Sequence, residues 1–236
     1  MVDPAFFQHC AFICVDIQEG EAPQPLSEDQ LPADWKAMGF QADDVAAANR
    51  FAWEVCLPNA VRVVEACRAT QMPMIFLHWG FRLPGGMDLD PLIRQVMARN
   101  HGGDASQWPG HIAGKGAQPA AVLGVQPGDY IIAKTGQDAF QSSSLGFVLV
   151  NLGVRHLIFV GGHTEACLGK TATSAKRKGY RTLCVEDATS NARESSRQKG
   201  IQDSQFDYVV TTSELMTILT GYRDSAHITS QQPHNP

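Results

Sequence analysis

Residues 157–167 read Leu157-Ile-Phe-Val-Gly-Gly-His-Thr-Glu-Ala-Cys167, and this stretch decides how the whole chain is interpreted. Its apolar start predicts a buried strand, which the two glycines end. Thr164 is a good helix N-cap, and a helical pattern runs from Glu165 towards Gly179. Cys167 therefore falls in the first turn of a helix, where backbone N–H groups and the helix dipole favour an anion. We predict a thiol that ionises readily and acts as a nucleophile, with a small buried core cysteine as the alternative.

Two other apolar segments also end in charged residues. Residues 10–16 are apolar up to the carboxylate of Asp16, and residues 129–134 end in the ammonium group of Lys134. Either one alone is typical of a solvated strand end. In an open parallel sheet, however, the carboxyl ends of the strands share one edge, where ligands bind. An acid, a cation and a thiol are therefore predicted to lie close together.

Strand and helix patterns alternate along the chain without an internal linker or repeat. We expect strands at about 10–16, 73–78, 129–133, 156–161, 181–186 and 208–210, and helices at about 43–70, 92–99, 142–152, 165–179, 190–204 and 213–219. The first helix is expected to break at Leu57-Pro58, because proline prefers a first turn. Repeated strand–helix units predict one three-layer α/β/α domain over 1–223, with a six-stranded, mostly parallel, doubly wound sheet. We expect an irregular segment at 19–42 and a disordered or partner-binding tail at 224–236.

Three motifs in order along the chain carry a family resemblance. They are Val15-Asp-Ile-Gln18, then Lys134 with Asp138-Ala-Phe140 and Leu145, then Gly161-Gly-His-Thr-Glu-Ala-Cys167 with Thr171-Ala172, Gly179-Tyr180 and Glu186-Asp-Ala188. Together they resemble the isochorismatase-like cysteine hydrolases, which include nicotinamidases, N-carbamoylsarcosine amidohydrolases and ureido-acid hydrolases. The resemblance covers roughly residues 8–220.

The resemblance implies a catalytic triad of Asp16, Lys134 and Cys167. It also implies a cis peptide bond at Gly162–His163, and an oxyanion hole formed by the backbone N–H groups of His163 and Cys167. In the implied mechanism, Asp16 takes the thiol proton and Lys134 stabilises the thiolate. Cys167 then attacks a carbonyl carbon, and water hydrolyses the resulting thioester.

The residues expected around this site leave the substrate open. The substrate contacts are predicted to come from Gln18, Trp79, Phe140 and Gln141, with Phe81 and His163 beside them. This mixture of apolar and polar side chains suits a small planar polar substrate. We predict a hydrolase that cleaves the C–N bond of a small carboxamide or carbamoyl (ureido) compound and releases ammonia or an amine. A vinyl-ether hydrolase of the isochorismatase type and a non-catalytic binding relative remain as alternatives.

We expect no metal and no other cofactor. In the family that the chain resembles, nicotinamidases bind a divalent metal through one Asp and two His after the second strand. Residues 77–82 of this chain lack that arrangement. His78 is therefore predicted to be a pocket or structural residue. His163 and Cys167 are four residues apart, but no further ligands follow at a spacing typical of zinc sites.

Composition excludes several classes of function. The formal net charge is −5 and there is no basic run, so nucleic-acid binding is not expected. The chain shows no signal-peptide pattern and no apolar stretch long enough to span a bilayer, so we expect a cytoplasmic protein without a membrane partner. Of the six cysteines, all but Cys167 are predicted to be reduced core residues.

The expected partners are a small-molecule substrate and further copies of the chain. The family resemblance implies a homo-oligomer, a dimer or a tetramer. Residues 35–40 and 108–112 combine aromatic and apolar side chains within polar loops, which is typical of interfaces. The alternative is that these two segments fold back over the active site of their own chain as a lid.

Overall fold

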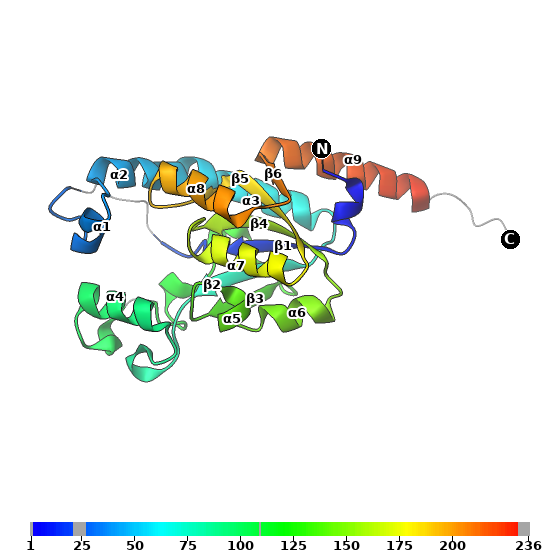
Figure 1. Cartoon of the computed structure of the whole chain (residues 1–236). Coiled ribbons are helices and arrows are strands. Elements are labelled where there is room, and N and C mark those ends of the chain that lie inside the picture. The colour runs from blue at the N-terminus through cyan, green and yellow to red at the C-terminus, as the bar shows by residue number, and fades with distance from the viewer. Residues whose placement is uncertain (1, 21–26, 109, 231–236) are drawn as a thin grey trace.

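The computed structural model describes residues 2–20, 27–108 and 110–230, and within them it forms one sheet between two layers of helices (Figure 1). The strands are β1 Cys10–Val15, β2 Met74–Trp79, β3 Tyr130–Lys134, β4 His156–Gly162, β5 Arg181–Ser190 and β6 Tyr208–Val210. Their order is β3-β2-β1-β4-β5-β6, and each described pair is parallel. The predicted six-stranded, doubly wound α/β/α fold is confirmed.

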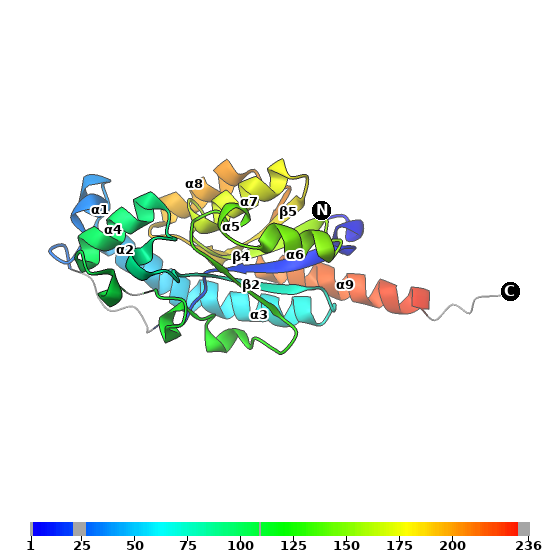
Figure 2. The ribbon, with the colours of Figure 1, turned by 90° about the horizontal axis from the view of Figure 1, so that it is seen from below.

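Helices cover both faces of the sheet, as the two views show (Figures 1 and 2). One face packs against α3 Leu57–Arg68 and α9 Thr212–Ser230, and the other against α5 Ala139–Ser142, α6 Leu145–Asn151 and α7 Cys167–Arg177. The remaining helices are α1 Ala33–Ala37, α2 Ala42–Phe51, α4 Pro91–His101 and α8 Glu194–Ser204, with short 3₁₀ turns at Pro4–Phe7, Pro84–Gly86, Ala105–Gln107, Lys115–Ala117 and Ala121–Leu123. No helix in the described ranges is long and apolar enough to cross a bilayer.

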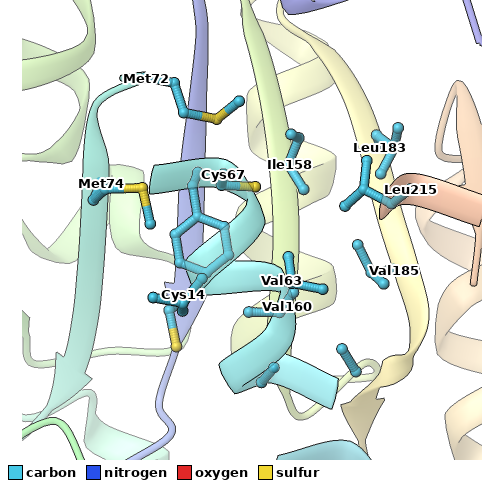
Figure 3. Close-up of a cluster of buried hydrophobic side chains, with 14 of the residues drawn as sticks. Cys14, Val63, Cys67, Met72, Met74, Ile158, Val160, Leu183, Val185 and Leu215 are labelled. Carbon is cyan, nitrogen blue, oxygen red and sulfur yellow. The ribbon is translucent and has the colours of Figure 1, made fainter. Parts of the chain in front are cut away.

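The central strand β1 shows why the sheet is buried on both sides. All six of its residues are buried, and successive side chains point to opposite faces. Phe12 belongs to the core cluster under α3 and α9, whereas Ile13 belongs to the cluster under α6 and α7. Figure 3 shows the first cluster, in which Val63 and Cys67 of α3 lie over the strands. Each large apolar side chain buried in this way stabilises the fold by about 1.5–3 kcal/mol.

The expected break at Leu57-Pro58 is not present. The chain stays helical from α2 through α3, with a π-helical turn at Ala52–Cys56 between them. The Leu57 N–H donates to the Ala52 carbonyl, five residues earlier. Pro58 has no N–H, and its ring would clash with a carbonyl four residues earlier in a regular helix. The wider π turn accommodates the proline, so the helix continues.

Three further boundaries differ from the sequence expectation. The predicted helix at 142–152 is split into α5 and α6, because Ser143 is extended with φ −155°. Strand β5 runs on to Ser190, since a bulge shifts its register against β4. Helix α9 continues to Ser230, so residues 224–230 are helical where we expected an irregular tail. Residues 21–26 of the irregular segment and residues 231–236 of the tail lie outside the described residues.

The aromatic residues expected at an interface are covered by their own chain. Trp108 is only 7% exposed and packs edge-to-face against Phe81, in a small core beside α4. Trp35 packs against Phe40, and the guanidinium group of Arg193 lies 4.3 Å from the centre of the Phe40 ring. Trp108 therefore packs within its own chain, because the loop folds back onto β2 and α4.

Helix α8 packs directly against the turn before α7. A Cβ atom at Gly200 would lie 2.4 Å from the carbonyl carbon of Thr164 and 2.6 Å from the Glu165 nitrogen. We expect Gly200→Ala to lower the free energy of unfolding by about 1–3 kcal/mol, because backbone atoms cannot yield to the extra methyl group. The measurement is urea denaturation followed by circular dichroism.

Gly221→Ala is the matched control. Nothing lies within 4 Å of a Cβ atom at that helical position. Alanine is the better helix former, so this variant should be as stable as the original chain or gain up to about 1 kcal/mol. Equal stability of the two variants would contradict the close contact at Gly200.

Candidate active site

The strand order reverses between β1 and β4, and in an open parallel sheet a ligand binds outside such a switch point. Asp16 directly follows β1, and β4 leads through residues 163–166 to Cys167 at the start of α7. Lys134 is the last residue of β3, two strands away from β1. The fold therefore brings the acid, the cation and the thiol to one edge of the sheet, as the sequence predicted.

An ion pair between Lys134 and Asp16 forms the centre of the site. The Lys134 Nζ atom lies 2.8 Å from Asp16 Oδ2 and also donates to the Gly136 carbonyl at 3.1 Å. The Lys134 side chain is fully buried. Burial lowers its pKa, but the attraction of Asp16 and Cys167 outweighs this effect and leaves the pKa raised, so the ammonium stays charged.

The backbone around Asp16 is unusual in a way that the sequence explains. Asp16 has a φ of 53°, a left-handed conformation that aspartate adopts more readily than most residues. Gly161, on the neighbouring strand, has a φ of 104°, and a Cβ atom there would lie 2.1 Å from the Val15 carbonyl oxygen. Only glycine lets the ends of β1 and β4 approach this closely. Within the described residues, the buried Asp16 Oδ1 atom has no hydrogen-bond partner.

The Cys167 thiol is harder to ionise than we expected. Burial raises its pKa to about 12, the nearby Asp16 carboxylate adds to the rise, and Lys134 opposes it. The helix N-terminus alone therefore does not produce a resting thiolate at neutral pH. Desolvation and a carboxylate neighbour outweigh the dipole.

Thr164 has a different role from the predicted N-cap. Its hydroxyl bonds to the carbonyls of Ser196 and Arg197, at 3.4 and 3.0 Å, and thereby ties the turn to α8. The residue at the N-cap of α7 is Ala166, without a side-chain cap. The turn is closed instead by the His163 carbonyl, which accepts from the Ala166 and Leu168 N–H groups.

The oxyanion hole was expected to be formed by the backbone N–H groups of His163 and Cys167. The Gly162–His163 peptide bond is cis. Neither the His163 N–H nor the Cys167 N–H has an acceptor within the part of the chain that the structure describes. The His163 side chain is exposed. Neither amide is therefore engaged by the described fold.

Gln18 and Trp79 lie close to this edge and contact their own chain, although the buried Trp79 Nε1–H has no hydrogen-bond partner among the described residues. The Gln18 side chain donates to the carbonyls of Trp79 and Gly116, at 3.0 and 3.2 Å, and accepts from the Trp79 N–H at 2.9 Å. It therefore joins the ends of β1 and β2. The Trp79 ring packs against Gly110, where a Cβ atom would lie 2.4 Å from it.

The structure does not bring Phe140 and Gln141 to Asp16. Phe140 packs against Tyr180 at a ring distance of 5.9 Å, and the Lys178 ammonium lies 5.7 Å from its ring centre. These contacts lie at the end of α7 that is remote from Cys167. Gln141 lines a separate polar groove of about 840 Å³ outside α5 and α7. Ala139 of α5 is fully buried, and Phe140 is partly buried against the same core cluster.

A cavity of about 450 Å³ opens beside Asp16. Its wall combines the end of β1, the helix from α2 to α3, and the 3₁₀ turn at 121–123: Asp16, Ile17, Gln18, Glu19, Gly20, Asn49, Ala52, Trp53, Cys56, Leu57, Ala120, Ala121, Val122 and Ser190. Sequence reasoning missed Asn49 and Trp53. Trp53 and Cys56 follow Asn49 by four and seven residues, a spacing that places all three on one helical face and that was present in the sequence.

No metal cluster is present among the described residues, in the sense of three or more His, Cys, Asp or Glu side chains that converge. His78 is buried, and its Nδ1 atom lies 2.6 Å from the Ala117 carbonyl oxygen. Burial lowers the pKa of this imidazole. His78 thus lies within β2, and its ring contacts the backbone of the 3₁₀ turn at Lys115–Ala117.

The chain is similar to known proteins in sequence and in fold. Residues 10–214 match the isochorismatase domain family. The ureidoacrylate amidohydrolase RutB of Variovorax paradoxus is 28% identical over 149 residues, 61% of this chain and 59% of that protein, so the match spans less than two thirds of that relative. RutB of an Enterobacter species is 27% identical over 198 residues, 81% of this chain and 80% of that protein.

Solved structures share the fold. An isochorismatase family protein from Burkholderia thailandensis has a TM-score of 0.64 at 21% identity, covering 93% of this chain and 97% of that one. The N-carbamoylsarcosine amidase from Thermoplasma acidophilum has a TM-score of 0.59 at 19% identity, covering 86% and 96%. At these identities the likeness concerns the fold alone.

We expect iodoacetamide to label Cys167 before any other cysteine. All six cysteines lie in the described part of the chain, and Cys167 alone is not buried. Because its pKa is raised to about 12, the thiolate fraction and the labelling rate should rise about tenfold per pH unit between roughly pH 6 and 10. Peptide mass spectrometry after timed labelling measures both. A labelling rate of Cys167 that no longer rises above pH 7, or faster labelling of another cysteine, would contradict the prediction.

Proposed function

The chain belongs to the isochorismatase family, and from this membership we propose that it is a cysteine-dependent amidohydrolase acting on small carboxamides or carbamoyl compounds. The observation that carries the proposal is the buried ion pair of Lys134 and Asp16 beside the Cys167 thiol. Relatives named as ureidoacrylate amidohydrolases, and a fold neighbour named as an N-carbamoylsarcosine amidase, support cleavage of a non-peptide C–N bond.

The raised pKa of Cys167 determines the first step of the proposed mechanism. A thiol with a pKa of about 12 does not lose its proton to water at neutral pH, so a base in contact with it must take the proton during attack. Asp16 offers that base through Oδ1, because Oδ2 is held by Lys134. The Lys134 ammonium stabilises the sulfur as its negative charge develops.

The remaining steps of the proposed mechanism use the same groups. The Cys167 sulfur bonds to the substrate carbonyl carbon, and the N–H groups of His163 and Cys167 hold the resulting oxyanion. The Asp16 carboxyl returns its proton to the leaving nitrogen, the C–N bond breaks, and ammonia or an amine departs from a thioester. Water, deprotonated by Asp16, then attacks the thioester and restores the thiol. Vinyl-ether hydrolysis and a purely binding role have less support, because neither needs a thiol between an acid and a buried cation.

We expect Cys167→Ala to abolish ammonia release, with a loss of at least about a thousandfold in kcat/KM, because no other group can form the thioester. The substrates to screen are nicotinamide, N-carbamoyl amino acids, ureido acids, biuret-like compounds and maleamate, each with and without a chelator. Cys67→Ala removes a thiol from the core under α3 and serves as the control. Full activity of Cys167→Ala would end the proposal.

We also propose that the protein acts in the cytoplasm as a homo-oligomer, a dimer or a tetramer. Six unpaired cysteines suit a reducing compartment. Phe147 and Val150 on α6 are 80% and 71% exposed, and Ile131 on the edge strand β3 is 51% exposed. Exposed large apolar side chains such as these favour contact with another copy.

Sedimentation velocity tests the oligomer. We expect the original chain to sediment as a dimer or tetramer, and Phe147→Glu to shift it towards the monomer, because a charge would be buried in the contact. Val209→Glu introduces the same charge at an exposed residue of β6, the opposite edge strand, and should leave the assembly intact. A monomer at micromolar concentration would overturn the proposed assembly.

A further inference from the structure

The cavity beside Asp16 lacks positive charge. Among its described lining residues there is no Lys, Arg or His, and the ionisable carboxylates are Asp16 and Glu19. Asp16 is paired with the buried Lys134, so that pair is neutral as a whole. Glu19 accepts only a backbone hydrogen bond, from the Ala121 N–H at 2.8 Å, and is not neutralised by a cation among the described residues. The cavity is therefore neutral to negative.

The outer walls of this cavity are apolar. Trp53 is 41% exposed and Val122 is 55% exposed, although both are large hydrophobic side chains. Trp53 belongs to the π-helical turn, which places it on the same side of the helix as the buried Cys56. Helical segments with a π turn often occur at functional sites. Apolar surface that remains exposed at the mouth of a pocket suits the apolar part of a ligand.

The polar group on this helical face is uncharged. Asn49 is half-buried at the cavity, and its side-chain amide has no hydrogen-bond partner among the described residues. It precedes Cys56 by seven residues, which corresponds to roughly 10 Å along a helix. An amide both donates and accepts hydrogen bonds but cannot neutralise a carboxylate. A ligand that reaches from Asp16 to Asn49 thus meets no cation.

We propose that the chain acts on neutral carboxamides with an apolar acyl group, and that it discriminates against amides that carry a carboxylate. This inference rests on the proposed amidohydrolase function and names its substrate class. A carboxylate in the cavity would lose water without gaining an opposite charge, and it would lie near Glu19. An alkyl chain would instead cover the exposed surfaces of Trp53 and Val122.

A matched substrate pair tests the proposal. Hexanamide and adipic acid monoamide share a six-carbon chain, and they differ in a methyl group or a carboxylate at the far end. We expect kcat/KM for ammonia release to be at least about tenfold higher for hexanamide. Equal values, or a preference for the acid, would overturn the proposal.

A single substitution should reverse the preference. Val122→Arg adds a cation to the cavity wall and removes apolar surface from it, so the ratio of kcat/KM for adipic acid monoamide to kcat/KM for hexanamide is expected to rise at least about tenfold. Val209→Arg adds the same charge at an exposed residue of β6 outside the cavity, and should leave the ratio unchanged. An unchanged ratio in Val122→Arg would show that the cavity does not bind the acyl group.

Binding to the Cys167→Ala protein separates this proposal from the proposed function. Ligand-observed NMR titration should give a lower Kd for hexanamide than for adipic acid monoamide, with no need for turnover. If hexanamide binds more tightly but the unaltered protein hydrolyses neither amide, the proposed selectivity is supported and the amidohydrolase function is wrong for these compounds. If the acid binds as tightly as hexanamide, the selectivity is wrong whatever the enzyme hydrolyses.

Discussion

The buried contact between Lys134 and Asp16 is the interaction on which the rest of this site depends. A fully buried ammonium is tolerated only with a partner, and removing one partner of such a pair typically costs about 3–5 kcal/mol. The pair joins strand β3 to the end of β1, across β2. It also leaves one buried oxygen of Asp16 without a hydrogen-bond partner among the described residues. The same contact therefore supports the sheet edge and holds the carboxylate that the proposed mechanism uses as a base.

The thiol is positioned by a second constraint, the close packing around the turn at 163–166. Thr164 bonds to two carbonyls of α8, and a Cβ atom at Gly169 would lie 1.9 Å from the Thr164 carbonyl oxygen. Helices α7 and α8 thus hold the turn between them. The Cys167 thiol thus follows a closely packed segment, which would suit the proposed reaction because small displacements of a reacting group are costly.

The sequence predicted the parts of this structure that follow from local pattern. Periodicity predicts three apolar strands, which end at Asp16, at Lys134 and at the glycines before Cys167. The sheet topology then brings the ends of these strands together. The thiol pKa could not be predicted in this way, because it depends on burial and on a carboxylate from a distant strand. The contacts of Phe140 could not be predicted from local pattern either, because they come from Tyr180 and Lys178, which are distant in sequence.

The raised pKa of Cys167 has a consequence for how this protein survives oxidative stress. Peroxide oxidises thiolates far faster than thiols, and the first product, a sulfenic acid, can proceed to irreversible forms. A cysteine that stays protonated until a carbonyl carbon is in place presents little thiolate to peroxide. The chain thereby differs from redox-sensing proteins, whose cysteines combine low pKa with exposure. A thiol with a pKa raised in this way is expected to react slowly with peroxide until a base removes its proton.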